Sequence, residues 1–285
     1  MKKVLDEAFL KLVRSLNLNL SVKLKNNKLG KKHSSDKGSS VEFSDYRAYS
    51  PGDDYRRIDW SALARFEKMF LKLYMEEQQA SISIFVDTSK SMEQEKKREA
   101  EIKLAALFAL SSLNEYDKVS LLFFDEVLHD EVRNVNGKQG FYRIADALES
   151  KSYASSGKLL DAVKQAAPKL KKGCSILITD LLYPHHLDEV LKLLNYRKQK
   201  VILCHVLAKE ELAVSFPGNV RLKDSETGQE INIDWNDGTA KLYEERLQAF
   251  LKEAQGICKA HNASYFLINA DEGIESLIHH LKKLS

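Results

Sequence analysis

The sequence has few cysteines, and none of them are close enough together to suggest a metal site. The three cysteines, Cys174, Cys204 and Cys258, are odd in number and far apart, and no Cys-x-x-Cys occurs. Neither a zinc ribbon nor a disulfide framework is therefore expected. Cys174 and Cys204 begin or lie within apolar runs, so we expect buried, reduced thiols.

Long apolar runs and an excess of one charge are also missing. No stretch approaches the roughly 20 apolar residues that span a bilayer, so no membrane span is expected. The first residues include Asp6 and Glu7 and lack a long apolar core, unlike a signal peptide. The 44 basic and 41 acidic residues are too balanced to predict nucleic-acid binding. We therefore expect a cytoplasmic protein that does not bind nucleic acid.

The chain of 285 residues is long enough for one large domain or two modest ones. From residue 81 onward, short apolar runs alternate with amphipathic helical segments. This alternation predicts an α/β fold with a mostly parallel central sheet and helices on both faces. Turn signals between residues 210 and 233 predict a small β-excursion. Residues 1–80, with a helix, a basic loop over 21–40 and a charged segment, form a separate N-terminal region in this interpretation.

One loop places three oxygen-bearing side chains directly after a predicted buried strand. The run from Ile82 to Val86 ends at Asp87, and Ser89 and Ser91 follow at two-residue intervals. In open α/β sheets, ligands bind outside the carboxyl ends of the strands. A carboxylate with two hydroxyls suits a hard cation such as magnesium, which keeps several waters. The alternative is that these side chains only cap a helix and bind loop amides.

Two further predicted strands also end at an acid. Asp125 follows the run from Val119, and Asp180 follows the run from Ser175. A small polar loop that contains Ser156 lies between them in sequence. If the three strands are neighbours in one parallel sheet, these groups converge on one edge.

The segment over residues 41–66 mixes opposite charges with aromatic residues around a Ser-Pro-Gly-Asp turn signal. Guanidinium groups match carboxylates geometrically, so this density predicts an ion-pair network. No histidine, cysteine or nucleophilic serine accompanies it, which argues against catalysis. We expect it to brace the chain or to form a contact surface. The residues of this predicted network are Asp45, Arg47, Asp53, Asp54, Arg56, Arg57, Asp59, Trp60 and Arg65.

The strand-end acids resemble the metal-ion-dependent adhesion site of the von Willebrand factor A domain, a Rossmann-like fold. That site has Asp-x-Ser-x-Ser, a threonine on a second loop and an aspartate after a later strand. Asp87, Ser89, Ser91 and Asp180 match this pattern, which implies a magnesium site. The chain departs from the pattern at the threonine, where it has Gly157. Ser155 and Ser156 are the nearby hydroxyls that could replace it.

The charged segment is similar to the bacterial "domain of unknown function 58" family. The block Pro-Gly-Asp-Asp-Tyr-Arg-Arg-Ile-Asp-Trp is long and therefore specific, and residues 220–228 also match. The resemblance covers roughly residues 38 to 283. Members commonly accompany MoxR-type AAA+ ATPases, so the resemblance implies an adaptor or co-chaperone that acts with such an ATPase on client proteins.

Three functions remain open at this point. The first is a non-enzymatic protein-binding module in which Asp87, Ser89 and Ser91 hold magnesium and Asp180 acts through water. The second is a metal-free scaffold with a degenerate site, which Gly157 favours. The third is a magnesium-dependent phosphohydrolase, since acids at strand ends with magnesium also begin such enzymes. The sequence lacks a paired aspartate and a phosphate-binding glycine loop, which argues against the third.

Overall fold

The computed structural model describes residues 4–15, 41–76, 80–114, 117–154, 156–214, 216, 218–224, 228–272 and 278. Contacts divide the chain into two compact units. The main unit comprises residues 1–27 and 80–285, and the small unit comprises residues 28–79. The predicted basic loop over 21–40 lies outside the described residues. Within the described residues, no helix is both long enough and apolar enough to cross a membrane.

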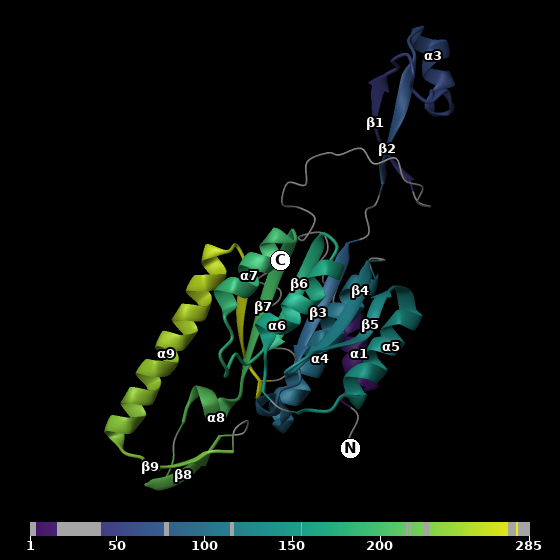
Figure 1. Ribbon diagram of the computed structural model, residues 1–285. Coiled ribbons are helices and arrows are strands. Elements are labelled where there is room, and N and C mark those ends of the chain that lie inside the picture. Colours follow the sequence, from purple (N-terminus) through teal and green to yellow (C-terminus); the bar gives the residue numbers. More distant parts are fainter. Residues whose placement is uncertain are drawn as a thin grey trace. The chain divides into compact units, whose positions relative to one another are not determined.

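A six-stranded sheet forms the centre of the main unit, in the order β10-β7-β6-β3-β4-β5 (Figure 1). All neighbouring strands are parallel except β4 and β5, which pair antiparallel. The predicted mostly parallel α/β fold is thus confirmed. From β3 the chain first steps outward to β4 and β5, and then returns to build β6, β7 and β10 on the other side. The boundary between β3 and β6 is therefore the switch point, where such sheets bind ligands. The strands are β3 (Ser81–Asp87), β4 (Lys118–Phe124), β5 (Leu128–Val135), β6 (Gly173–Thr179), β7 (Gln199–Leu207) and β10 (Ser264–Asn269).

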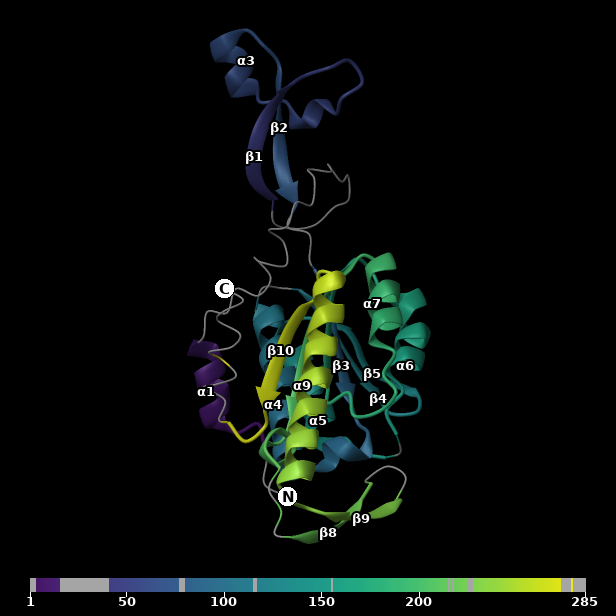
Figure 2. The ribbon, with the colours of Figure 1, turned by 90° about the vertical axis from the view of Figure 1, so that its left-hand side faces the viewer.

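Helices cover both faces of this sheet, as its alternating side chains require (Figure 2). On β3, Ile82, Ile84 and Val86 point to one core cluster and Phe85 points to the other. The first cluster is covered by α1 (Glu7–Ser15), α4 (Glu95–Asn114) and α5 (Gly137–Ser150). The second is covered by α6 (Leu159–Ala166), α7 (Leu187–Tyr196) and α9 (Asp237–Ala260).

The N-terminal helix α1 belongs to the core of the main unit. Leu5, Phe9 and Val13 are buried in the first core cluster. The backbone N–H of Leu5 also donates to Oε1 of Glu149, on α5, at 2.7 Å. The structure therefore differs from the grouping of this helix with residues 17–80, because its apolar face packs on α4 and α5.

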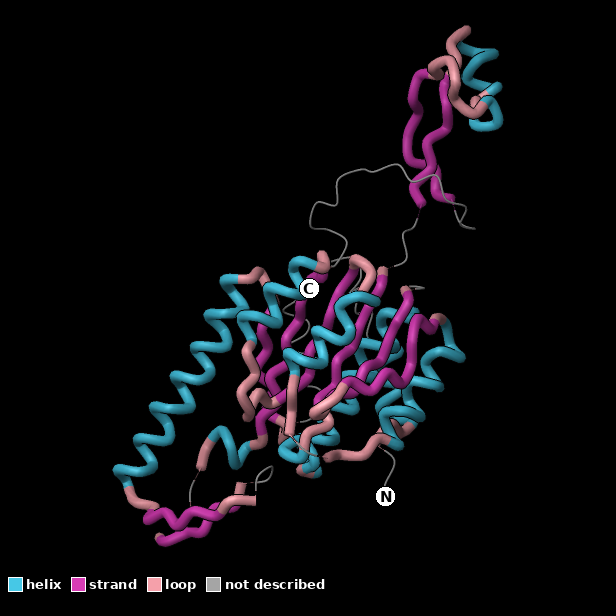
Figure 3. Tube along the Cα trace, viewed as in Figure 1, coloured by secondary structure: helices cyan, strands magenta, loops and turns pink. Residues whose placement is uncertain are grey.

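A hairpin interrupts the α/β alternation where turn signals predicted it. Strands β8 (Asn219–Lys223) and β9 (Glu230–Asp234) pair antiparallel in a sheet of their own (Figure 3). Trp235, just after β9, packs against the rings of Phe216 and Tyr243. The Tyr243 hydroxyl in turn donates to the carbonyl oxygen of Glu211, in α8 (Lys209–Leu212), at 2.7 Å. The hairpin is thereby linked to the helix that follows β7.

The small unit is a β-hairpin with helical turns between its strands, which the sequence patterns did not predict. Strands β1 (Val41–Ala48) and β2 (Phe70–Glu76) pair antiparallel. Between them lie the turn of 3-10 helix η1 (Tyr55–Arg57) and the helix α3 (Trp60–Phe66). The predicted turn is present, and Gly52 has a φ of 103°, a conformation that favours glycine.

We expect Phe9→Ala to lower the free energy of unfolding by about 3 kcal/mol, because it removes a buried ring and leaves a cavity in the core. Urea unfolding of the full chain measures this loss. The exposed neighbour Lys11, changed to alanine, provides the control and should leave the midpoint unchanged. Equal stability of the two variants would contradict the packing of α1 in the core.

Candidate functional site

The carboxylate of Asp87 lies at the switch point, where β3 ends beside β6. Its Oδ1 accepts a hydrogen bond from the backbone N–H of Ser89 at 2.9 Å. Its Oδ2 accepts one from the hydroxyl of Thr179, the last residue of β6, at 2.5 Å. Because β3 and β6 are parallel neighbours, Asp87 and Thr179 end their strands at the same level. We call residues 87–91 and 179–183, together with Lys97, the rim.

The two predicted serines lie together beside Asp87. Their hydroxyl oxygens are 3.1 Å apart. Ser89 is fully buried, whereas Ser91 is partly exposed. Both lie at the start of the 3-10 turn η2 (Lys90–Glu93), in which the Met92 N–H donates to the Ser89 carbonyl at 3.0 Å. The structure thus brings Asp87, Ser89 and Ser91 together, as the spacing predicted.

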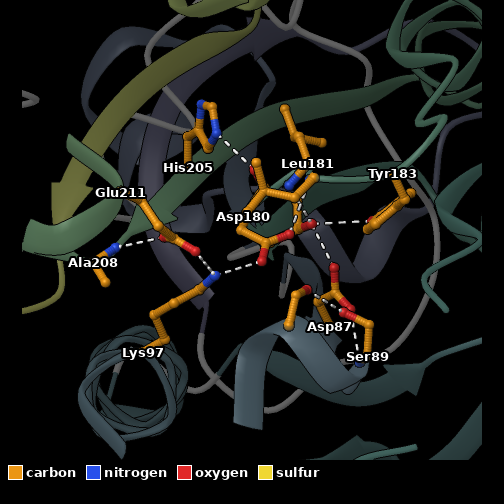
Figure 4. A network of polar contacts seen from close by, with 12 residues as sticks. Asp87, Ser89, Lys97, Asp180, Leu181, Tyr183, His205, Ala208 and Glu211 are labelled. Atoms are coloured by element: carbon orange, nitrogen blue, oxygen red, sulfur yellow. Dashed lines mark hydrogen bonds and ion pairs between the residues drawn. The ribbon is translucent and has the colours of Figure 1, made fainter. Parts of the chain in front are cut away.

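Asp180 reaches the same rim, but a lysine already neutralises it (Figure 4). Its Oδ2 accepts from the ammonium of Lys97 at 2.6 Å, and its Oδ1 accepts from the Leu182 N–H at 3.0 Å. The same ammonium donates to Oε1 of Glu211 at 2.9 Å. The side chains of Lys97 and Asp180 are completely shielded from solvent. Lys97 therefore joins the start of α4 to the end of β6 and to α8.

The ring of Tyr183 explains why the chain has glycine where the adhesion-site pattern has threonine. A Cβ atom at Gly157 would lie 2.2 Å from Cε1 of Tyr183, far inside van der Waals contact. The Tyr183 hydroxyl and the Thr179 hydroxyl are 3.0 Å apart, which ties the ring to the Asp87 network. Ser156, the predicted substitute, is half-buried one residue before Gly157, and Ser155 lies outside the described residues.

Burial and neighbouring charges shift the pKa values of Asp87 and Lys97. Burial, with the nearby Asp180 carboxylate, raises the pKa of Asp87 to about 7, although hydrogen bonds from Thr179 and Ser89 oppose this shift. Burial alone would lower the pKa of Lys97, but the charges of Asp180 and Glu211 outweigh it and raise that pKa. Lys97 is therefore a permanent cation.

His205, on β7, contacts the backbone of Asp180. Its Nε2 lies 2.8 Å from the Asp180 carbonyl oxygen, which can only accept, so Nε2 carries the proton. Its Nδ1 then accepts from the Tyr265 hydroxyl at 2.9 Å. Burial lowers the pKa of His205 to about 4, so the imidazole is neutral at physiological pH.

These residues do not fit a hydrated magnesium ion. Asp87, Ser89 and Asp180 have no exposed surface, and both oxygens of each carboxylate already accept hydrogen bonds. Magnesium needs near-octahedral oxygen ligands and usually keeps several waters, and these buried oxygens, which already accept hydrogen bonds, leave no room for them. Across the described part of the chain, no group of three His, Cys, Asp or Glu side chains could hold a metal ion.

The remaining strand-end acid, Asp125, has separate partners. Its Oδ1 accepts from the Val127 N–H at 3.0 Å, and Nε2 of His129 lies 3.2 Å away. An open pocket of about 430 Å³ lies just beyond Asp180 instead. It is lined by Leu181, Leu182, Tyr183, Pro184, His185 and Phe250.

In the small unit, the predicted charge network is centred on Asp59. Its Oδ1 accepts from the N–H groups of Ser61 and Ala62, and so caps α3. Its Oδ2 accepts from the Tyr46 hydroxyl at 2.9 Å and lies 3.3 Å from the Lys72 ammonium. A second pair joins Arg47 to Asp53 at 2.7 Å.

Of the other members of the predicted network, five face solvent: Asp54, Arg56, Arg57, Trp60 and Arg65. The backbone of Asp45 is part of β1, and its side chain lies outside the described residues. The Asp54 carboxylate caps η1 through the Arg56 N–H at 3.0 Å, and the Arg56 guanidinium lies over the Tyr55 ring. We call residues 55–69 the aromatic–arginine segment. Its exposed members are Tyr55 (63% exposed), Trp60 (61%), Phe66 (65%), Met69 (47%), Arg56, Arg57 and Arg65.

A doubly wound, mostly parallel α/β unit with an Asp-x-Ser-x-Ser loop at its switch point defines the von Willebrand factor A-like class. The chain belongs to the family described as "Protein of unknown function DUF58", whose model matches residues 45–250.

Individual proteins are also similar to this chain. The uncharacterized protein Rv1480 of Mycobacterium tuberculosis is 24% identical over 69% of this chain and 65% of its own length. The chain thus spans less than two thirds of that curated relative. Among solved structures, BatB from Bacteroides thetaiotaomicron has a TM-score of 0.46 and 16% identity over 72% of this chain and 98% of its own. A von Willebrand factor type A protein from Catenulispora acidiphila has a TM-score of 0.46 and 13% identity over 75% of this chain and 43% of its own.

The sequence patterns missed three residues of the rim, Lys97, Thr179 and Tyr183, and the Glu211 partner of Lys97. A signal for Lys97 exists, because it shares helical spacing with the buried residues Glu101, Leu104 and Phe108 of α4. A lysine on the apolar side of a helix indicates a buried acid partner. No comparable pattern marks Tyr183, whose role depends on its proximity to Gly157.

We expect Gly157→Ala to destabilise the chain by about 1–3 kcal/mol, because the new methyl group overlaps the buried Tyr183 ring. The same substitution in a Tyr183→Ala background should cost much less, since the ring is gone. Urea unfolding of the two single variants and the double variant measures this coupling. If the losses of stability in the two single variants simply added in the double variant, the methyl group at residue 157 and the Tyr183 ring would not compete for the same space.

We expect His205 to make stability rise with pH between about 4 and 6.5. In this window the unfolded imidazole binds a proton and the buried one does not. The slope amounts to at most about 1.4 kcal/mol per pH unit. Asp87 contributes the opposite slope, because its folded pKa lies above its unfolded value, so the test compares variants.

Unfolding of the wild type and His205→Gln across this pH range measures the difference in slope. The partly exposed His129, changed to glutamine, serves as the control. Identical slopes for the wild type and His205→Gln would contradict a neutral, buried imidazole.

Proposed function

We propose that this chain is a non-enzymatic protein-interaction module that acts as an adaptor for a MoxR-type AAA+ ATPase. The observation that carries the proposal is the exposed aromatic–arginine segment of the small unit. Tyr55, Trp60 and Phe66 each expose more than three fifths of their surface. Several large apolar side chains exposed within one short segment favour a binding surface.

The chemistry of the segment suits an acidic partner. Tryptophan, tyrosine and arginine are the residues that most often dominate binding energy at protein interfaces. Arg56, Arg57 and Arg65 supply positive charge along the same segment, and guanidinium groups pair with carboxylates in two-point contacts. Asp59 and its hydrogen bonds hold α3 in place, so the segment is presented on an ordered scaffold.

The closed rim favours this surface over a metal-dependent adhesion site. A partner carboxylate that binds through a metal needs an open coordination position, and the buried rim acids offer none. The same burial argues against a phosphohydrolase, because both oxygens of Asp87 accept hydrogen bonds and none faces solvent as a nucleophile. These observations favour the metal-free scaffold among the functions that the sequence left open.

We expect Trp60→Ala and Arg57→Glu to weaken binding to a purified MoxR-type ATPase by at least tenfold, about 1.4 kcal/mol each. The physical reason is the loss of an exposed aromatic anchor in one variant and the reversal of a charge in the other. Biolayer interferometry with the immobilised full chain measures the affinity.

Tyr196→Ala is the matched control, because Tyr196 is an aromatic residue of α7 that is 81% exposed on the main unit. Its affinity should equal that of the wild type. Failure of the wild type to bind would contradict the adaptor role. Equal binding by all variants would contradict the assigned surface.

A further inference from the structure

A lysine and two carboxylates form a polar cluster in the main unit, and a third carboxylate lies close by. The ammonium of Lys97 contacts Asp180 and Glu211, and Asp87 lies on the adjacent strand. Lys97 and Asp180 have no exposed side-chain surface, and Glu211 is 27% exposed. A buried charge is costly unless it is paired and hydrogen-bonded. The position of this lysine therefore needs an electrostatic reason.

The reason lies in the pair of acids at the switch point. Asp87 is the last residue of β3 and Asp180 follows the last residue of β6, and the two carboxylates are close enough to repel each other. The raised pKa of Asp87 relieves part of this repulsion, and the fully buried Asp180 carboxylate still needs a cation beside it. A divalent ion can supply that charge, and so can an ammonium at the end of a lysine side chain.

We propose that the ammonium of Lys97 takes the electrostatic place of a divalent cation beside Asp180, so that this carboxylate is neutralised from within the chain and the site stays closed without metal. Lys97 projects from the first turn of α4. Its four-carbon side chain reaches Asp180, and both residues stay fully buried. The ring of Tyr183 fills the neighbouring space at Gly157. Lys97 and Tyr183 thus fill this part of the rim with the protein's own side chains.

This substitution changes what the rim does. A metal ion offers an open position to an external ligand, whereas an ammonium with two carboxylate partners is already occupied. Glu211 connects Lys97 to the start of α8. Its Oε2 accepts a hydrogen bond from the Ala208 N–H at 2.8 Å. The rim thereby becomes a fixed junction of β6, α4 and α8.

The test removes the lysine charge and asks whether metal replaces it. A chelator first removes bound metal from three full-length proteins: the wild type, Lys97→Met and Lys97→Met/Asp180→Asn. Each protein is then titrated with Mn²⁺. Thermal midpoints and isothermal calorimetry report binding. Lys192→Met, at an exposed lysine that also pairs with an aspartate, controls for the loss of a charge.

We expect no Mn²⁺ binding and no shift in midpoint for the wild type and for Lys192→Met. Lys97→Met should have a lower midpoint that Mn²⁺ partly restores. The double variant should be more stable than Lys97→Met without metal, because it lacks the uncompensated Asp180 charge, and Mn²⁺ should not affect it. The double variant keeps the test informative even where Lys97→Met fails to fold without metal.

Two results would overturn the proposal. Saturable Mn²⁺ binding by the wild type that Asp87→Asn abolishes would show that a metal shares the rim with Lys97. A Lys97→Met variant whose folding and midpoint ignore Mn²⁺ would show that the lysine does not occupy a cation's place. Neither readout involves the ATPase, so the outcome is independent of the proposed adaptor role.

Discussion

An ammonium ion enclosed in a protein interior persists only where carboxylates surround it, because its loss of hydration is expensive. Lys97 meets this condition through Asp180 and Glu211. The pair sets the orientation of Asp180, whose carbonyl then accepts from His205 and whose other carboxylate oxygen holds the Leu182 N–H. Glu211 extends the same connection toward α8 and, through its carbonyl, to Tyr243 of α9. One cation thus coordinates helices on both faces of the sheet.

The division between the two units gives them different physical tasks. In the main unit, polar groups at the switch point are paired with each other and hidden from solvent. In the small unit, hydrogen bonds to Asp59 keep a helix in place while aromatic rings and arginines face outward. A buried network gives conformational specificity, whereas exposed rings on an ordered helix give recognition.

Much of this architecture was accessible from the sequence, for physical reasons. Buried parallel strands are continuous apolar runs, so Ile82–Val86 and its counterparts identified the sheet, and the acids that end them identified the rim. Lys97 escaped because a helical lysine usually faces solvent, and only its spacing with Leu104 and Phe108 indicates otherwise. The hairpin of the small unit escaped because its charged residues mask strand alternation. Contacts such as that between Tyr183 and Gly157 depend on tertiary proximity, which no local pattern records.

The steric exclusion between Gly157 and Tyr183 has an evolutionary consequence. A threonine and a large ring cannot occupy these two positions in one chain, so a lineage that changes one must also change the other. Within this family, glycine at the first position should accompany an aromatic residue at the second, and threonine should accompany a small one. That pair of positions would then divide relatives into those whose rim is filled by a ring and those whose rim has room for a ligand.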